Sequence, residues 1–111
     1  MSYSVYPTPD FKKFVKKLSK KHPSLKSDLQ DLILVLKEKP DSGISLGQGI
    51  HKIRMAISSK GKGKSGGARV ITYLVTEDNE VYLVYIYDKS QLENISKEQI
   101  IELLKKAGLI K

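Results

Sequence analysis

Residues 52–75 read KIRMAISSKGKGKSGGARVITYLV, in which a run of glycine and lysine separates two apolar segments. Before the run, Ile53 and Met55 alternate with Lys52 and Arg54, which is the period of a β-strand with one buried face. After it, residues 69–75 form a second apolar segment. The stretch therefore predicts two antiparallel strands joined by a basic loop, and a fold organised around a sheet.

The loop matches the residue patterns of two nucleotide-binding motifs. Residues 61–66 (GKGKSG) match G-x-G-x-x-G, and residues 63–65 match the end of a Walker A motif. Both motifs need a helix directly after them, whose N-terminal amides hold the phosphates. Residues 67–72 predict a strand instead, and the first Walker glycine would fall at Ser58. A kinase glycine loop does join two strands, but 111 residues cannot hold the rest of a kinase. A nucleotide site is therefore excluded.

Two interpretations of the loop remain, a mobile hairpin tip kept soluble by its lysines and a clamp for phosphates. Its glycines leave backbone amides accessible, and its lysines can reach phosphates in several directions. Lys52 and Arg54 project from the preceding strand, and Arg69 begins the next one. The clamp is favoured because these strand cations can converge with those of the loop.

The N-terminal part of the chain predicts one strand and two helices. Residues 3–6 are a short strand, and Thr8 can cap a helix that has Pro9 in its first turn. His22 precedes a proline and ends this helix, and a second helix runs over about 24–39. So short a turn predicts an antiparallel helical hairpin. The first helix carries six lysines, read mainly as a solvated face and alternatively as a surface for a nucleic-acid backbone: Lys12, Lys13, Lys16, Lys17, Lys20 and Lys21.

The C-terminal part completes an α+β fold. Glycines between 43 and 49 mark a loop, residues 81–87 are apolar enough for a central strand, and a capping box at 96–99 begins a last helix. The order β-α-α-β-β-β-α predicts a single domain over 1–111. In it, an N-terminal strand and the helical hairpin pack on an antiparallel sheet, with a C-terminal helix.

Charge and composition narrow the partners. Twenty Lys and Arg against twelve Asp and Glu give a net charge of +8. Such a field attracts nucleic acid, an anionic membrane or an acidic protein segment, and nucleic acid is favoured over a protein that is merely rich in lysine. No apolar run is long enough to span a bilayer, and the N-terminus lacks the order of a secretory signal, so a cytoplasmic location is expected. The absence of cysteine excludes disulfides and a thiol nucleophile.

Three segments together resemble the RelE/ParE toxin superfamily. Residues 52–75 and 81–96 (VYLVYIYDKSQLENIS) are similar to its core, and residues 10–40 to its helical hairpin. The similarity is greatest to the HigB-like and RelE-like branch, the toxins of bacterial type II toxin–antitoxin modules. It implies a ribosome-dependent mRNA endonuclease that uses 2′-hydroxyl attack on the adjacent phosphate, with no cofactor and no metal. It also implies a cognate antitoxin, often a small helix-turn-helix protein, and operator binding by the complex.

The resemblance assigns catalytic positions to Lys52, Arg54, Arg69 and Lys89. The arginines do not readily release protons and are expected to clamp phosphate, whereas either lysine is a candidate acid or base. RNA contacts are expected from three lysines of the loop and three tyrosines: Lys60, Lys62, Lys64, Tyr73, Tyr85 and Tyr87. RelE-like toxins often carry a tyrosine near the C-terminus. This chain has none after Tyr87, so that role is absent or belongs to one of these three.

Alternation gives the faces of some of these side chains. It puts Tyr73 on the side of Arg69, and it puts Tyr85 and Tyr87 on a common face that the sequence does not identify. His51 begins a strand on its apolar side, which favours a structural role.

His22, at a helix end, is expected at the surface.

Two other functions remain open. One is a ParE-like toxin of the same fold that acts on gyrase, which the clustered cations disfavour. The other is a basic nucleic-acid-binding module without catalysis, including a degenerate toxin.

Overall fold

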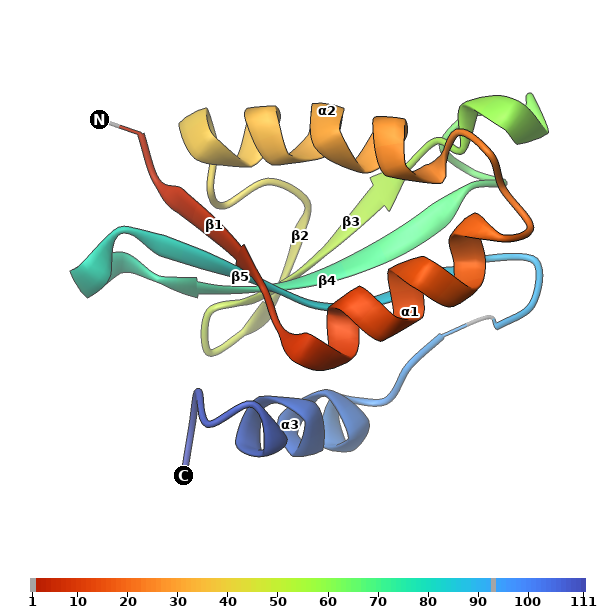
Figure 1. Cartoon of the computed structure of the whole chain (residues 1–111). Coiled ribbons are helices and arrows are strands. Elements are labelled where there is room, and N and C mark those ends of the chain that lie inside the picture. Colours follow the sequence, from red (N-terminus) through yellow and green to blue (C-terminus); the bar gives the residue numbers. More distant parts are fainter. Residues whose placement is uncertain (1, 93) are drawn as a thin grey trace.

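Five strands form one sheet that has helices on both faces (Figure 1). The computed structural model describes residues 2–92 and 94–111, and the strand order within them is β1-β5-β4-β3-β2. In chain order the elements are β1 (Ser4–Pro7), α1 (Pro9–Ser19), α2 (Leu25–Glu38), β2 (Ile44–Gly47), β3 (Ile50–Met55), the short 3-10 helix η1 (Ser58–Lys60), β4 (Ala68–Val75), the 3-10 helix η2 (Thr76–Asp78), β5 (Glu80–Asp88) and α3 (Lys97–Lys106).

The predicted α+β class and order of elements are confirmed, with one short strand added. β3, β4 and β5 form the expected antiparallel meander. The added strand is β2, which pairs with β3 inside the segment predicted as a loop. Gly43 and Gly47 at its ends have φ of 90° and 87°, so the turn signals that flank β2 concealed it. β1 pairs in parallel with β5, and the sheet is therefore mixed.

The predicted helix starts are also present. The Thr8 hydroxyl accepts a hydrogen bond of 3.1 Å from the backbone N–H of Phe11, and Pro9 occupies the first turn of α1. At α3, Ser96 and Gln99 form the reciprocal capping box. None of the helices in the described residues is long and apolar enough to cross a membrane.

Two hydrophobic clusters hold the layers together, one on each face of the sheet. α1 and α2 cover one face, called here the hairpin face, and α3 covers the other, called the α3 face (Figure 1). The buried residues of the hairpin face are Phe11, Leu25, Leu29, Leu36, Ile53, Met55, Ile57, Ala68, Val70, Val81, Leu83 and Ile86. Those of the α3 face are Ile50, Ile71, Val84, Tyr87, Ile95, Ile100 and Leu104.

A bulge in β5 reverses the alternation of side chains halfway along the strand. The pairing with β4 shifts by one residue between Leu83 and Tyr85, which leaves Val84 as an extra residue. Val84 and Tyr85 therefore both lie on the α3 face. Beyond them Tyr87 lies on the α3 face, while Asp88 faces the turn of the helical hairpin. The sequence did not identify the face shared by Tyr85 and Tyr87, and the bulge places both on the α3 face.

Candidate nucleic-acid interface

Arg54, Arg69 and Tyr87 stand in one row across three neighbouring strands. Arg54 of β3 is the register partner of Arg69 of β4, and Arg69 also pairs with Tyr87 of β5. Like charges directly opposite each other destabilise a sheet. In residues 2–92 and 94–111, no carboxylate forms an ion pair with either arginine. The row therefore concentrates positive charge on the α3 face at an electrostatic cost.

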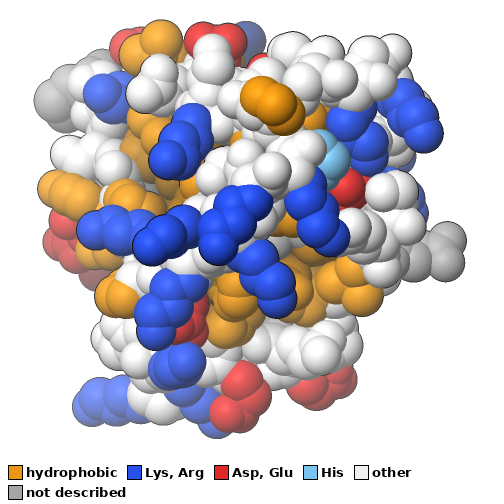
Figure 2. Space-filling view, turned by 45° about the vertical axis from the view of Figure 1, so that its right-hand side comes forward, with side chains coloured by type: hydrophobic (Ala, Val, Ile, Leu, Met, Phe, Trp, Pro, Cys, Tyr) orange, Lys and Arg blue, Asp and Glu red, His pale blue; other side chains and the backbone are white. Residues whose placement is uncertain are grey.

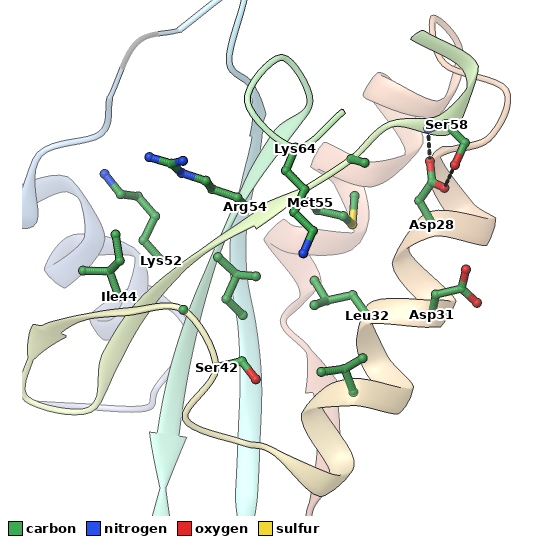
Figure 3. A pocket seen from close by; sticks show the side chains of 14 residues that line it. Asp28, Asp31, Leu32, Ser42, Ile44, Lys52, Arg54, Met55, Ser58 and Lys64 are labelled. Carbon is green, nitrogen blue, oxygen red and sulfur yellow. Dashed lines mark hydrogen bonds between the residues drawn. The ribbon is translucent and has the colours of Figure 1, made fainter. Parts of the chain in front are cut away.

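Lys52 extends this charge along β3. It lies two residues before Arg54, is half-buried, and its Nζ donates a hydrogen bond of 3.3 Å to Asn94 Oδ1. In Figure 3 the side chains of Lys52 and Arg54 both point away from α2. The structure thus places Lys52, Arg54 and Arg69 on one face, as the alternation predicts, while their catalytic roles remain predictions.

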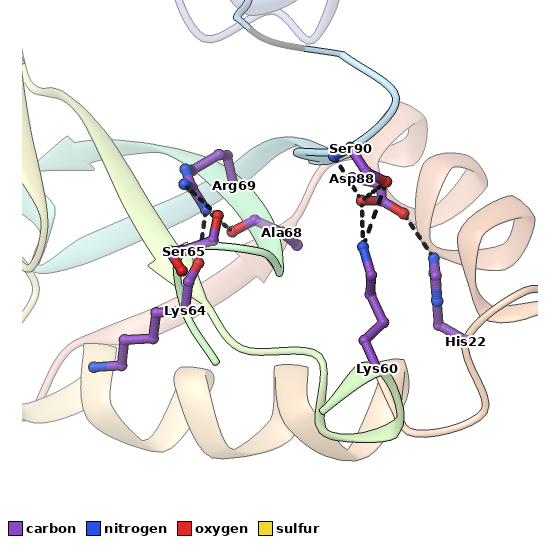
Figure 4. Close-up of polar contacts among 8 residues, drawn as sticks. All are labelled: His22, Lys60, Lys64, Ser65, Ala68, Arg69, Asp88 and Ser90. Atoms are coloured by element: carbon purple, nitrogen blue, oxygen red, sulfur yellow. Dashed lines mark hydrogen bonds and ion pairs between the residues drawn. The ribbon is translucent and has the colours of Figure 1, made fainter. Parts of the chain in front are cut away.

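The Arg69 side chain is buried and holds the backbone of the basic loop. It is only 6% exposed, and its Nη1 donates to the carbonyl oxygens of Lys64 and Ala68 at 2.9 and 3.1 Å. Its Nη2 donates to the Ser65 carbonyl at 3.3 Å (Figure 4). Arg69 therefore organises the loop in addition to adding charge, a duty that the prediction of a phosphate clamp did not include.

Tyr87 contributes a buried hydroxyl to the row. The side chain is 4% exposed, and within the described residues its hydroxyl has no hydrogen-bond partner. Burial raises the pKa of Tyr87, although the nearby charge of Arg69 acts in the opposite direction. The hydroxyl therefore stays protonated at neutral pH and keeps a proton that it can donate.

The other two tyrosines differ in their distance from the row. The ring centres of Tyr85 and Tyr87 are 5.8 Å apart. The Tyr85 ring also packs edge-to-face against Phe14, with 4.6 Å between the ring centres. Tyr73 lies on the predicted face, packed against the cluster under α3. It is four residues from Arg69 along β4, roughly 13 Å. The structure therefore brings Tyr85 near the row but leaves Tyr73 away from it.

The three loop lysines do not point the same way. Lys62 and Lys64 are exposed, as an RNA contact requires. Lys60 turns inward, and its Nζ lies 2.9 Å from Asp88 Oδ1, where the side chain is only 13% exposed (Figure 4). An ammonium held by a buried carboxylate is already neutralised, so the expected contact between Lys60 and RNA does not fit this geometry.

The two histidines lie away from the row. The prediction of a surface position for His22 is wrong, because its side chain is 12% exposed and its Nε2 lies 2.9 Å from Asp88 Oδ2. His51 is buried on the hairpin face, with Nδ1 3.2 Å from the Gly49 carbonyl, in line with the structural role expected for it. Within residues 2–92 and 94–111 no three His, Asp or Glu side chains gather as metal ligands do.

Asp88 is the residue that sequence reasoning missed. It is 3% exposed and sits between Tyr87 and Lys89 at the end of β5. The backbone N–H of Lys89 donates 3.0 Å to the carbonyl of Gly67, which joins the end of the loop to the end of β5. The available signal was an acidic residue placed directly after an apolar strand and before a cation.

A groove of about 620 Å³ runs between α2 and β3 (Figure 3). Arg54 and Lys64 border one side, and Asp28 and Asp31 of α2 border the other. Carboxylates on that wall repel a phosphate backbone. The surface suited to a polyanion is therefore the α3 face beside the loop, on the other side of β3.

A second basic surface, called here the α1 surface, lies on α1 and on the turn that follows it. Its lysines are all exposed, and within the described residues none of them forms an ion pair. They are Lys12, Lys13, Lys16, Lys17, Lys20 and Lys21. Figure 2 shows Lys and Arg side chains in a band across this side of the molecule. α2 and α3 instead mix acidic and basic residues.

Comparison with known proteins agrees with this architecture. Residues 4–111 match the family described as "RelE toxin of RelE / RelB toxin-antitoxin system", and the chain belongs to this family. The fold is similar to that of a double arginine mutant of the E. coli toxin RelE in the free state. The TM-score is 0.64 at 16% sequence identity, over 96% of this chain and 98% of that one. The resemblance to the RelE/ParE superfamily is thus confirmed, while the HigB-like branch stays a prediction.

Proposed function

We propose that this toxin is a ribosome-dependent endoribonuclease that cuts translated mRNA. The row of Arg54, Arg69 and Tyr87 carries the proposal. Within residues 2–92 and 94–111 its two cations have no carboxylate partner, and its buried hydroxyl has no hydrogen-bond partner. A protein that needed this face only for packing would gain stability by replacing the exposed Arg54, whose charge faces that of Arg69. Membership of the RelE family supports the same conclusion.

The proposed reaction uses the RNA's own 2′-hydroxyl as the nucleophile. The 2′ oxygen forms a bond to phosphorus while the bond from phosphorus to the 5′ oxygen breaks, which gives a 2′,3′-cyclic phosphate and a 5′-hydroxyl. One proton leaves the 2′ oxygen and another reaches the 5′ oxygen. The protein must align the attack, neutralise the phosphate oxygens and move these protons.

The side chains of the row divide this work by their chemistry. Arg54 and Arg69 retain their protons and neutralise the phosphate oxygens. Tyr87 donates a hydrogen bond, and proton transfer is assigned to Lys52 and Lys89. In this proposal Lys62 and Lys64 hold the RNA strand and Tyr85 stacks on a base, which contributes about 1–3 kcal/mol per base. Without a histidine at the row the site is slow on free RNA, which explains the need for a ribosome that presents the mRNA.

We also infer a cognate antitoxin with an acidic surface or segment. A net charge of +8 attracts such a partner and speeds its association. In the inferred assembly the antitoxin is a small helix-turn-helix protein, and the complex binds its own operator DNA. An antitoxin that covers the row would neutralise the toxin.

The test is cleavage of mRNA on purified translating ribosomes, with the ends of the transcripts mapped. Arg54→Ala removes an exposed member of the row, and Lys37→Ala removes one exposed cation of α2 as the matched control. We expect Arg54→Ala to slow cleavage by about one hundredfold and Lys37→Ala to leave it unchanged. Intact transcripts with the wild-type toxin would overturn the proposal, and inhibition of gyrase supercoiling would then support the ParE-like alternative.

A further inference from the structure

The carboxylate of Asp88 joins three segments that are far apart in the sequence. Its Oδ2 lies 2.9 Å from His22 Nε2, in the turn between α1 and α2. Its Oδ1 accepts from Lys60 Nζ of η1 at 2.9 Å, and from the N–H and hydroxyl of Ser90 at 3.0 and 2.8 Å. Figure 4 shows His22 and Lys60 pointing at this one carboxylate. We refer to His22, Lys60 and Asp88 as the clasp.

A second set of contacts fixes η1 from the side of α2. The Asp28 carboxylate accepts hydrogen bonds from the N–H and the hydroxyl of Ser58. The Ser24 hydroxyl accepts from the N–H of Ser59 at 2.8 Å. The start of the basic loop is thus held between α2 and β5, just as its end is held by Arg69.

Between these anchors, the tip of the loop at Gly61 and Gly63 borders open space. A side chain added at Gly61 or Gly63 would meet no atom within 4 Å, and both residues have positive φ. Lys62 projects from this exposed part, and the exposed Lys64 follows it at the point where Arg69 binds the backbone. The position of the two lysines therefore depends on the fixed ends of the loop.

We propose that Asp88 and Lys60 are positioning residues that hold the basic loop in place beside the row of Arg54, Arg69 and Tyr87. This inference rests on the proposed function, because it assigns the clasp a part in presenting RNA to that site. Asp88 itself faces the hairpin side of the sheet and does not touch the substrate. Its neighbours in the chain, Tyr87 and Lys89, are the site residues whose spacing from the loop it sets.

The chemistry of the clasp favours positioning over simple stabilisation. A buried ion pair is costly to desolvate, and apolar residues of similar size often give equal or greater stability. Charged hydrogen bonds instead fix direction, because four donors surround one carboxylate at defined distances. Lys60 belongs to the basic loop but binds an internal carboxylate, which is consistent with a need for a fixed loop.

The experiment compares Lys60→Met with Lys62→Met, which remove the same charge from the same loop. Amide hydrogen exchange is measured at Lys60, Gly61 and Gly67, whose N–H groups are hydrogen-bonded. Cleavage is measured against the concentration of translating ribosomes. We expect Lys60→Met to speed exchange at these amides at least tenfold and to lower the maximal cleavage rate at least tenfold. Lys62→Met should leave exchange unchanged and raise the half-saturating concentration instead.

Two further variants separate positioning from a general loss of folding. Lys60→Arg can reach the same carboxylate and should restore both exchange and cleavage. Asp88→Asn should lower the maximal rate as Lys60→Met does. The double variant Lys60→Met/Asp88→Asn should have a maximal cleavage rate no lower than that of either single variant, because both substitutions remove the same contact.

The outcomes separate the clasp from the proposed function. Unchanged amide exchange in Lys60→Met overturns the clasp whether or not the toxin cleaves RNA. Faster exchange with wild-type cleavage overturns its positioning role. Absence of cleavage by the wild-type toxin overturns the proposed function, and with it the catalytic part of this inference.

Discussion

Arg54 and Arg69 face each other across two strands, yet their surroundings give them different duties. Arg54 is exposed, and Arg69 is buried with its guanidinium on the carbonyl groups of the loop. A substitution at Arg69 therefore disturbs the loop as well as the charge. Arg54 is therefore the better probe of the charge alone.

This difference predicts opposite effects on stability. Arg54→Gln relieves the repulsion between facing cations and should raise the free energy of unfolding by about 0.2–1 kcal/mol. Arg69→Gln leaves buried carbonyl groups without donors and should lower it by about 1–3 kcal/mol. Thermal unfolding of both variants beside the wild type measures the effect. Equal destabilisation by the two substitutions would show that the facing charges impose no strain on the sheet.

Asp88 predicts a dependence of stability on pH. Hydrogen bonds from Lys60, Ser90 and His22 hold the pKa of its carboxyl well below the usual value, against the effect of burial. A carboxyl whose pKa is lowered in the folded state stabilises the fold above its unfolded pKa, near 4, and loses this contribution as the pH falls toward its folded pKa. The stability of the wild type against urea should thus fall between pH 5 and pH 3, by about 1 kcal/mol.

Asp88→Asn provides the control for this titration. An amide does not ionise, so the difference in stability between wild type and variant should shrink steadily as the pH is lowered over the same interval. A difference that stays constant from pH 7 to pH 3 would mean that Asp88 is not the group responsible.

Among the elements, the basic loop shows how two glycines in one segment meet different constraints. A Cβ at Gly67 would overlap the carbonyl oxygen of Met55, a backbone atom that cannot turn aside. Gly61→Ala would meet open space and bear only the cost of φ at 69°. We expect Gly67→Ala to cost about 2–3 kcal/mol and Gly61→Ala about 1 kcal/mol. Denaturant unfolding compares them, and similar values would mean that the end of the loop adapts freely.

The elements also show what sequence alone can predict. The strands and helices were predicted because an alternating or helical period repeats over enough residues to be read. β2 has four residues, too few for a period, and the positive-φ residues Gly43 and Gly47 lie just before it and at its end. The bulge at Val84 lies in an uninterrupted apolar strand, so nothing local marks it. Its position depends on the pairing with β4, which is a property of the sheet.

The same reasoning applies to the candidate site. Arg54 and Arg69 could be placed on one face because each belongs to a regular strand joined by a single loop. The clasp could not, since His22, Lys60 and Asp88 meet only after the hairpin has packed on the sheet. Long-range contacts between single polar residues leave no periodic signal in the sequence.

For the whole molecule, charge is distributed unevenly rather than spread over the surface. The lysines of α1 have no carboxylate partners in the described residues, whereas the cations of α2 lie among Asp28, Asp31 and Glu38. Charges of one sign at successive helical turns repel each other. The net charge of +8 is therefore concentrated in part on the α1 surface, which gives the electric field of the molecule a direction.

This field should speed the association of RNA with the toxin. Replacing Lys13, Lys17 and Lys21 together by glutamine should lower the association rate with a single-stranded RNA by about tenfold at low salt. The effect should fade at high salt, because the charges are screened. Stopped-flow binding measures it, and the matched control replaces Lys26, Lys37 and Lys39 of the α2 side. Equal loss in the two variants would mean that net charge alone matters.

The parallel pairing of β1 with β5 has a consequence for biosynthesis. Ser4 is the register partner of Glu80, so the first strand of the chain has no partner until β5 has been made. α1 packs against β5 as well. Contacts between such distant segments delay folding until most of the chain is available.

A chain still being translated therefore has its arginines and its basic loop but no sheet to align them. Arg69 and Tyr87 become neighbours only when β4 and β5 have paired. For a toxin proposed to act on ribosomes, this order of synthesis keeps the proposed site unformed during most of translation. The row of Arg54, Arg69 and Tyr87 cannot assemble on the ribosome that makes the protein until β5 has been synthesised.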